Sequence, residues 1–363
     1  MVIGMDAREA AGKPAGKGRY AKELITHLPR VAPRTTFRLY TREVLPGLRR
    51  KNIVWCPEEQ LGPRWHAKVA GRAGRECDLY VATTSYLTAQ FLRLPYVLVV
   101  YDLITFKDFA VPQRKAKVVE RLTLRRAAKR AKAIITISQA TADDLAKLVP
   151  NIRSKITVTP LAADAQFRPK HPPRDLAKLR KKYDLPASFV LTTGTIEPRK
   201  NLVRLIRAYG ALSAKLKEKH ALVLVGKRGW DYAEIFAAME EMSARGGDIR
   251  YIDFVSDEDL ARLYASCTLF AYPSLYEGFG LPVLEAMQSG APVLTSNISS
   301  LPEVGGDAVA YTDPHNTGDI ADNLAKLLSS AAVRRRLSAA GIRRAKRFSW
   351  QKTAETTWEV LRG

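Results

Sequence analysis

Glu277 and Glu285 lie eight positions apart, and the segment between them contains two glycines and a proline. Pro282 suits the first turn of a helix, where its missing N–H is not needed, so a helix is expected over Val283 to Gly290. Glu285 would then lie in the first turn. A helix-start charge and a solvated loop residue are the simplest roles for these carboxylates. A fixed carboxylate can also accept two hydrogen bonds at once, as a ribose diol or a sugar ring offers them.

The glycines of this segment indicate a second kind of chemistry. Gly278 and Gly280 let the backbone approach a phosphate with no side chain in the way. The free N–H groups and the dipole of the expected helix start attract the same group. Phosphate next to carboxylates that bind hydroxyls is the pattern of a nucleotide-sugar site, so the segment predicts one.

Two cations stand at an expected strand-to-helix turn. A strand is followed by Gly194, Thr195 and then the pair Arg199 and Lys200, and a helix is expected over 202–212. The planar fork of Arg and the point charge of Lys could neutralise a diphosphate and stabilise the charge that develops as it leaves. A solvated helix start is the alternative, because Arg-Lys pairs are common in so basic a chain.

The first half holds two further candidate sites. Gly16 and Gly18 follow the first expected strand and form a loop where the backbone could approach a ligand, although a plain flexible loop has the same composition. Tyr101 and Asp102 follow the expected strand 97–100, and the carboxyl ends of parallel strands face the ligand cleft in open α/β sheets. Asp102 could equally cap the following turn. None of the five histidines sits at such an end, so no metal site is expected.

These residues need parallel sheets to position them, and the sequence predicts two. Short apolar strands alternate with helical patterns from end to end, the pattern of α/β domains. We expect two Rossmann-like domains that face each other across a cleft, over 1–165 and 188–345, with a proline-containing charged linker over 166–187. The segment 346–363 is expected to be an amphipathic helix that packs back on the first domain. The expected strands are 2–5, 37–40, 79–82, 96–100, 133–137 and 156–159, then 189–193, 221–225, 249–254, 269–272 and 292–295.

The composition is that of a globular protein, with 46% hydrophobic and 26% charged residues among 363. No apolar run approaches the roughly 18 residues needed to cross a bilayer, and the start reads as a strand rather than a signal peptide. A cytoplasmic location is therefore expected. The three cysteines lie far apart, which indicates neither a disulfide framework nor a zinc site.

The net charge of +23 is concentrated in the first half, where residues 1–165 hold 30 basic and 14 acidic residues. Over 113–132 nine basic residues accompany the single acid Glu120, with apolar residues interleaved at helical spacing. An anionic membrane surface, a nucleic acid and plain solvation all fit such a face. We favour peripheral docking on the inner face of the cell membrane, because no nucleic-acid-binding signature is present.

With these features, the chain resembles the family 4 glycosyltransferases, which are retaining, nucleotide-sugar-dependent enzymes with the two-domain GT-B fold, and especially their bacterial mannosyltransferase-like members. The resemblance covers nearly the whole chain. Its most specific parts are Glu277-Gly-Phe-Gly-Leu-Pro-Val-Leu-Glu285, the turn 194–201 and the segment 299–305, and the stretches 16–20 and 136–138 also match.

The resemblance implies a role for each charged candidate. Arg199 and Lys200 would bind the donor diphosphate, Glu285 the ribose hydroxyls and Glu277 the transferred sugar. The family is metal-independent, so the two cations would take the place of a metal ion and no other cofactor is expected. The first domain would bind the acceptor.

The resemblance also implies backbone contacts to the donor. Phe279, Gly280 and Leu281 would offer N–H groups to the sugar and phosphate, and Val255 would contact the base. One departure is Tyr101, which stands before Asp102 where many relatives carry histidine, so a phenol would replace an imidazole near the transferred sugar. Its ordinary pKa near 10 makes it a poor base at neutral pH.

The function expected from all of this is retaining transfer of a sugar, mannose from GDP-mannose, to a lipid-linked or polysaccharide acceptor such as lipopolysaccharide. A nucleotide-sugar epimerase or a phosphorylase with the same fold is one alternative. A non-catalytic basic protein that binds a membrane or nucleic acid is another.

Overall fold

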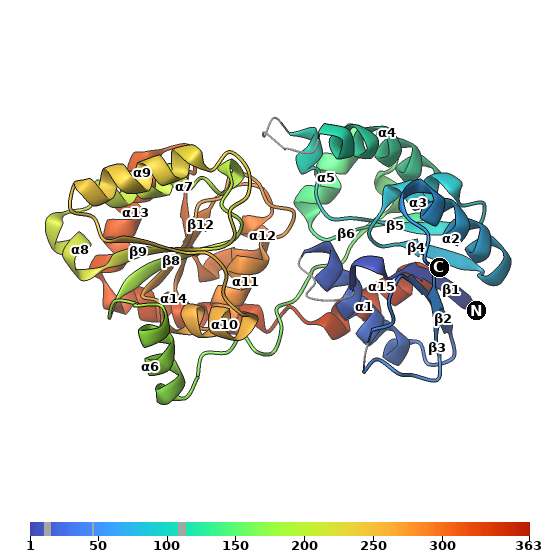
Figure 1. Ribbon diagram of the computed structural model, residues 1–363, viewed down its shortest axis with the longest axis horizontal. Coiled ribbons are helices and arrows are strands. Elements are labelled where there is room, and N and C mark those ends of the chain that lie inside the picture. Colours follow the sequence, from blue (N-terminus) through green and yellow to red (C-terminus); the bar gives the residue numbers. More distant parts are fainter. Residues whose placement is uncertain (11–15, 46, 108–113) are drawn as a thin grey trace. The chain divides into compact units, whose positions relative to one another are not determined.

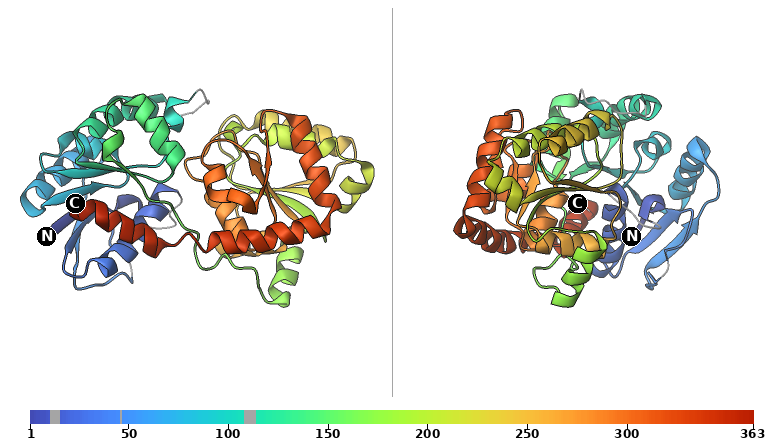
Figure 2. Two further views of the ribbon diagram at one scale, coloured as in Figure 1. Left: turned by 180° about the vertical axis from the view of Figure 1, so that it is seen from behind. Right: turned by 60° about the vertical axis from the view of Figure 1, so that its left-hand side comes forward.

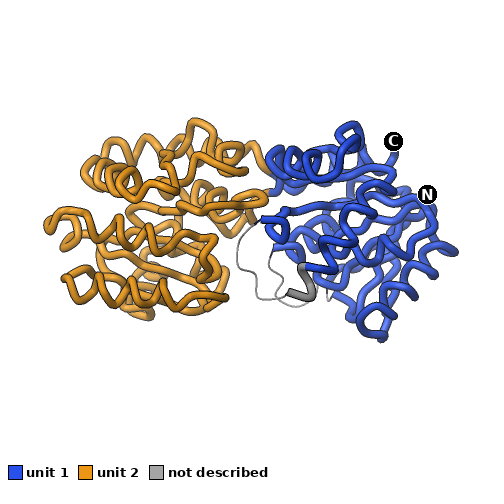
Figure 3. The backbone as a smooth tube through the Cα atoms, turned by 90° about the horizontal axis from the view of Figure 1, so that it is seen from above, with its two compact units in different colours: residues 1–107, 113–161, 349–363 blue, residues 108–112, 162–348 orange. Residues whose placement is uncertain are grey.

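The computed structural model describes residues 1–10, 16–45, 47–107 and 114–363, and the chain divides into two compact units (Figure 1; Figure 3). Unit 1 contains the described residues up to Leu161 together with Ser349–Gly363, and unit 2 contains Ala162–Phe348. Each unit is a parallel sheet covered by helices, so the expected fold class of two Rossmann-like α/β domains is confirmed.

Unit 1 is built on a seven-stranded parallel sheet with the order β3-β2-β1-β4-β5-β6-β7. Its central strands are continuous apolar runs because helices bury both faces of the sheet, and every residue of β5 is buried. The strands are β1 (Val2–Asp6), β2 (Thr36–Thr41), β3 (Ile53–Pro57), β4 (Leu79–Ala82), β5 (Tyr96–Val100), β6 (Ala133–Thr136) and β7 (Ile156–Val158).

The helices of unit 1 form two layers (Figure 1). One layer places α3 against both α2 and α4, and the other places the last helix of the chain, α15, against α1 (Figure 2). The helices are α1 (Lys17–Val31), α2 (Gly62–Glu76), α3 (Tyr86–Phe91), α4 (Arg114–Arg130), α5 (Gln139–Leu148) and α15 (Trp350–Arg362), with 3₁₀ turns η1 (Arg8–Ala10), η2 (Ile104–Phe106) and η3 (Arg153–Lys155).

Unit 2 repeats the design with a six-stranded parallel sheet in the order β10-β9-β8-β11-β12-β13. The strands are β8 (Phe189–Thr193), β9 (Ala221–Val225), β10 (Ile249–Ile252), β11 (Leu269–Tyr272), β12 (Val293–Ser296) and β13 (Ala310–Thr312). Helix α7 packs against α9 and α13 in one layer, and α11 packs against α10 and α14 in the other (Figure 1).

The helices of unit 2 are α6 (Pro173–Lys182), α7 (Leu202–Gly210), α8 (Ala214–Lys219), α9 (Ala233–Ala244), α10 (Asp257–Ser266), α11 (Leu281–Gln288), α12 (Leu301–Gly305), α13 (Thr317–Ser329) and α14 (Ala331–Ala345). Two 3₁₀ turns, η4 (Pro198–Lys200) and η5 (Gly306–Ala308), complete the unit. The segment 166–187, expected as a linker, contains α6 and belongs to unit 2.

Two strands, β3 and β13, were not predicted from the sequence. Both lie at an edge of their sheet, but the other two edge strands, β7 and β10, were predicted, so an edge position alone does not explain the difference. Strand β13 has only three residues, whereas β3 is apolar in sequence and was overlooked. Among the described residues, no helix combines the length and the apolar character that a membrane span requires.

Candidate active site

The charged candidates of unit 2 meet where its strand order reverses. Strand β8 pairs with β9 on one side and β11 on the other, and the chain leaves the carboxyl ends of β8 and β11 in two turns. Open α/β sheets bind ligands at such a switch point. The first turn carries Arg199 and Lys200 in η4, and the second carries Glu277.

The turn after β8 holds its shape through two backbone positions with positive φ. Gly194 has a φ of 121°, and a Cβ there would lie 3.3 Å from Cε of Lys200, so the glycine makes room for that side chain. Asn201 is left-handed with a φ of 59°, and its Nδ2 donates to the carbonyls of Pro273 (3.0 Å) and Pro314 (2.7 Å). Asn201 therefore ties the first turn to the second.

Glu277 is the centre of a buried charged cluster. Lys200 Nζ lies 2.7 Å and Arg199 Nη1 lies 2.8 Å from its Oε1. The hydroxyls of Tyr272 and Ser274 donate to the same oxygen at 2.7 and 2.8 Å. Because all four contacts fall on Oε1, no described residue occupies the hydrogen-bonding positions of Oε2.

Glu197 adds a second carboxylate to the cluster. Its Oε1 lies 2.6 Å from Nη2 of Arg199 and accepts a hydrogen bond from Nε at 2.8 Å. With Arg199, Lys200 and Glu277, the cluster holds two formal positive and two formal negative charges. The two cations are therefore neutralised inside unit 2, which the sequence analysis did not anticipate.

Burial and charge act in opposite directions on these groups. Burial alone would raise the pKa of Glu277, but Lys200 and Arg199 outweigh it and lower that pKa to about 2. Glu197 shows the reverse balance, since burial raises its pKa despite Arg199. Burial also lowers the pKa of the Lys200 ammonium, opposed by Glu277. Glu277 is therefore ionised at neutral pH.

The loop from Glu277 to Gly280 is held by two serines that follow β12. Ser299 Oγ donates to the carbonyl of Glu277 (2.7 Å) and accepts from its N–H (3.1 Å). Ser300 Oγ bridges the carbonyls of Glu277 (2.9 Å) and Phe279 (2.8 Å). Gly280, with a φ of 108°, then starts α11, and no side chain of the described chain caps that helix start.

Glu285 is buried in α11, but the expectation that it lies in the first turn is wrong. The helix begins at Leu281, so Glu285 is its fifth residue and lies in the second turn. The positive φ of Gly280 starts the helix one residue before Pro282. Tyr264 links Glu285 to the end of β8, because its hydroxyl lies 3.4 Å from Oε2 of Glu285 and 2.8 Å from Oγ1 of Thr193.

The other candidates of unit 2 lie in the turn after β8, around the start of α11 and after β10. Thr195 is exposed in the turn after β8, and Gly278 is in the loop before α11. Phe279 is buried edge-to-face against Phe348, and Leu281 is the first residue of α11. Val255 is buried after β10, two strands from β8, and the strand itself ends at Ile252 rather than Phe254.

Among the unit 1 candidates, Tyr101 requires a correction. Its phenol is buried, donates to the carbonyl of Thr83 and packs edge-to-face on Tyr20. Burial raises its pKa well above the ordinary value. The hydroxyl is therefore used inside unit 1, which contradicts the expectation that it contacts a transferred sugar.

The remaining unit 1 candidates have structural roles. Asp102 Oδ1 accepts from the N–H of Ile104 at 3.0 Å, the turn cap that its sequence also allowed. Gly16 is the N-cap residue of α1 with a φ of 51°, and Gly18 is buried in the first turn of that helix.

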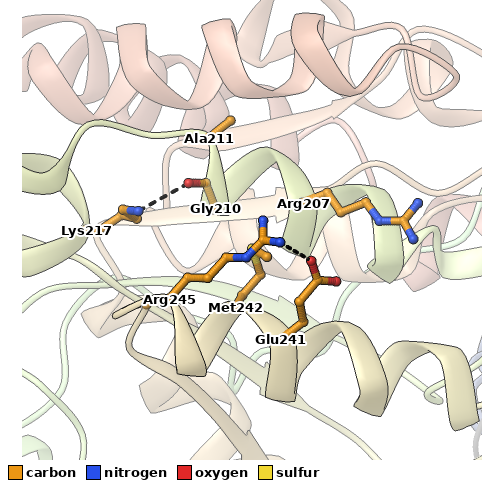
Figure 4. Close-up of a pocket in the computed structure, with 8 residues that line it drawn as sticks. Arg207, Gly210, Ala211, Lys217, Glu241, Met242 and Arg245 are labelled. Atoms are coloured by element: carbon orange, nitrogen blue, oxygen red, sulfur yellow. Dashed lines mark hydrogen bonds and ion pairs between the residues drawn. The ribbon is translucent and has the colours of Figure 1, made fainter.

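A cavity of about 340 Å³ in unit 2 lies apart from the cluster (Figure 4). It is lined by residues at or just after the ends of α7 and α9 and by Lys217 of α8, in the segments that lead into β9 and β10. It therefore lies toward the amino ends of these strands, away from the cluster. Two of its cations are already used, because Arg245 pairs with Glu241 at 2.9 Å and Lys217 donates to the carbonyl of Gly210 at 3.2 Å. We therefore leave this cavity out of the candidate site.

The sequence did not predict the roles of four residues that hold the cluster in place, namely Tyr272, Ser274, Glu197 and Asn201. Each stands directly beside a segment that was identified, at the end of β11 or within the turn 194–201. Position at a strand's carboxyl end was the available signal. Across the described ranges, no three His, Cys, Asp or Glu side chains are grouped closely enough to hold a metal ion.

Comparison with known proteins agrees with this architecture. Residues 177–344 match the family described as "Glycosyl transferases group 1", and residues 15–167 match "Glycosyltransferase Family 4". The structure of Anabaena Alr3699/HepE in complex with UDP and glucose matches 100% of this chain and 99% of that chain with a TM-score of 0.77, at 19% identity, and shows the shared fold.

Two curated relatives come from Escherichia coli. "O-antigen chain mannosyltransferase B" is 36% identical over 260 residues, which is 70% of this chain and 68% of the relative. "Serotype-specific mannosyltransferase WbdA" is 38% identical over 232 residues, 63% of this chain but only 28% of that longer protein. On these matches, the chain belongs to the family 4 glycosyltransferases.

Proposed function

We propose that this glycosyltransferase moves mannose from GDP-mannose to a polysaccharide or lipid-linked acceptor with retention of the anomeric configuration. The names of the Escherichia coli relatives support the sugar and the kind of acceptor. The observation that carries the proposal is the cluster of Arg199, Lys200, Glu197 and Glu277 beside the uncapped start of α11, at the switch point of the sheet.

The diphosphate would be bound by Arg199, Lys200 and the backbone N–H groups of Phe279, Gly280 and Leu281 at the start of α11. The N–H groups of Val283 and Leu284 are already bonded to the carbonyl of Gly280. Because both cations are paired with carboxylates, they act as a neutral, pre-oriented set rather than as a free positive patch. The helix N–H groups and dipole then supply the remaining attraction for the phosphates. Preorganised donors of this kind stabilise the charge that develops as the diphosphate leaves.

The two carboxylates of the original pattern would bind hydroxyls. Glu285, held by Tyr264, would accept hydrogen bonds from the ribose diol. The Glu277 carboxylate makes its contacts with described residues through Oε1, and its Oε2 would accept from the transferred sugar. In the retaining reaction, the C1–O bond to phosphate breaks and the bond to the acceptor oxygen forms on the same face. The acceptor proton passes to the leaving phosphate.

The test is transfer by the purified protein from radiolabelled GDP-mannose to an α-mannoside acceptor, with UDP-glucose as the alternative donor. We expect a mannosylated product from which an α-mannosidase releases the labelled mannose. Conversion of the nucleotide sugar without acceptor would support an epimerase instead. If the protein forms no product and binds neither donor, the proposal is refuted.

We also propose that α4 docks unit 1 on an anionic membrane surface. Val118, Val119 and Leu122 are 53%, 44% and 73% exposed on this helix, and basic residues including Arg125 and Arg126 are exposed beside them. Apolar insertion combined with basic attraction is the pattern of reversible interfacial helices.

Sedimentation with phosphatidylglycerol vesicles tests this docking. Leu122→Ser should weaken binding severalfold, whereas Val44→Ser, an equally apolar change at a 49% exposed site of unit 1, should not. Equal loss in both variants, or binding that only salt controls, would exclude apolar insertion by α4.

A further inference from the structure

Unit 1 has a cavity of its own at the point where its strand order reverses. The cavity measures about 320 Å³ and is lined by Lys17, Thr84, Ser85, Tyr86, Leu87, Val119, Glu120 and Thr123. Strand β1 lies between β2 and β4, Thr84 and Ser85 follow β4, and Lys17 begins the helix that follows β1. The carboxyl ends of β1 and β4 are thus the ligand position expected of a doubly wound sheet.

Two opposite charges in this cavity are available to a ligand. Within the described residues, neither Lys17 nor Glu120 forms an ion pair. The Lys17 ammonium lies 5.9 and 5.8 Å from the ring centroids of Tyr86 and Tyr101. Burial raises the pKa of Glu120, Lys17 opposes that rise and Asp102 adds to it, so the carboxylate is partly desolvated rather than free in solvent.

The position of Glu120 on its helix is informative. It is the single acid among nine basic residues over 113–132, and it lines the cavity while Leu122 and Arg125 on the same helix are exposed. An acid that only balanced the charge of the basic face would lie on that face. Its inward position instead places a hydrogen-bond acceptor in the cavity with three hydroxyls. The hydroxyls of Thr84 and Thr123 donate to Asp6 and to the carbonyl of Val119, so they can still accept from a ligand. Ser85 accepts from the N–H of Leu87, so its hydroxyl can still donate.

The lining favours a neutral polyol over an anion. Hydroxyl groups, one carboxylate that can accept two hydrogen bonds and one ammonium donor match the hydroxyls of a sugar. An aromatic side chain, Tyr86, gives the cavity an apolar wall as well. A phosphate group would meet one cation, Lys17, and be repelled by Glu120, which forms no ion pair among the described residues. The carboxylates of the unit 2 cluster differ, because each is paired with a cation.

We propose that this cavity binds an uncharged sugar residue of the acceptor, with Glu120 accepting hydrogen bonds from its hydroxyls and Lys17 donating to it. The inference rests on the proposed function for the identity of that sugar as a mannoside. It makes Glu120 and Lys17 residues that select a neutral acceptor terminus over a phosphorylated one.

The test measures binding without transfer. Saturation-transfer NMR and calorimetry with 4-nitrophenyl α-mannoside and with mannose 6-phosphate are run on the wild type, Glu120→Gln, Lys17→Gln and the control Glu59→Gln. Glu59 is an exposed acid of unit 1 that lies outside the cavity. We expect the neutral mannoside to bind the wild type and the control, and Glu120→Gln to weaken it roughly tenfold or more, the loss of a charged hydrogen bond.

Other outcomes separate the two proposals. Unchanged mannoside binding in Glu120→Gln overturns the inference. It is also overturned if the wild type prefers mannose 6-phosphate to the neutral mannoside and Glu120→Gln strengthens that preference. Absence of any mannoside binding to the wild type overturns it as well. If GDP-mannose fails to bind while the mannoside binds as expected, the proposed donor is wrong and the acceptor cavity stands.

Discussion

Replacement of Glu277 by glutamine should destabilise unit 2, because it removes one negative charge from a buried cluster and keeps the shape of the side chain. An ordinary Glu has a pKa of 4.5 and that of Glu277 is lowered to about 2. Each pKa unit corresponds to 1.36 kcal/mol, so the ionised carboxylate contributes about 3 kcal/mol to the free energy of unfolding. Removing one partner of a buried ion pair typically costs ~3–5 kcal/mol, which agrees.

The pH dependence has a definite sign. Because the pKa of the folded state is depressed, the stabilisation is fully present above pH 4.5 and is lost as the pH falls toward 2. The difference between wild type and Glu277→Gln should therefore be about 3 kcal/mol at pH 7 and about half of that near pH 3.

Urea unfolding followed by circular dichroism measures this difference at several pH values. Glu234→Gln is the matched control, because its side chain is 72% exposed and lies 3.8 Å from Arg207, a surface pair worth less than ~1 kcal/mol. A Glu277→Gln effect below about 1 kcal/mol at pH 7, or one that does not change between pH 7 and pH 3, would show that the ionised carboxylate does not stabilise unit 2 in this way.

Three further changes give separate predictions. Asn201→Ala loses three side-chain hydrogen bonds, two donated by Nδ2 and one accepted from Arg204, and leaves alanine in a left-handed position. Urea unfolding should show a loss of about 2–4 kcal/mol, against about 1 kcal/mol for Asn151→Ala at an exposed left-handed site. An equal loss in both would contradict the tie between the turns. Tyr101→Phe loses the hydrogen bond to Thr83 and should lower stability by about 1 kcal/mol while the donor profile is unchanged; an altered profile would restore a ligand role for the phenol. Glu285→Gln should raise the donor KM roughly tenfold or more, while Glu258→Gln, 75% exposed, should not, and equal KM values would remove Glu285 from the donor site.

The sequence was most informative where both faces of an element are buried. Strands such as Tyr96–Val100 and Ala221–Val225 are apolar throughout, and the sequence identified them at their observed positions. Of the four edge strands, β7 and β10 were predicted and β3 and β13 were missed. Strand β13 has only three residues, and β3 is an apolar run that was overlooked. Short-range rules therefore recovered the centres of both parallel sheets and two of their four edges.

The cluster of unit 2 shows the same limit. The types and spacing of Arg199, Lys200 and Glu277 indicated a common site, and the structure brings these three side chains into contact. That Glu277 neutralises the cations could not be read from the sequence, because the pairing with Lys200 joins two turns separated by 77 residues. Glu197 pairs with Arg199 only two residues away, and this local pairing was overlooked. Likewise, nothing local distinguishes a buried phenol at Tyr101 from one that faces a ligand.

Calorimetric titration of GDP-mannose measures whether Arg199 binds the diphosphate of a nucleotide sugar, as proposed for unit 2. The wild type is compared with Arg199→Gln and with the control Arg207→Gln. Arg207 is exposed and lies near the end of α7, away from the cluster. We expect Arg199→Gln to weaken binding roughly tenfold or more and Arg207→Gln to bind as the wild type does. Equal affinity in all three proteins would exclude Arg199 from the donor site.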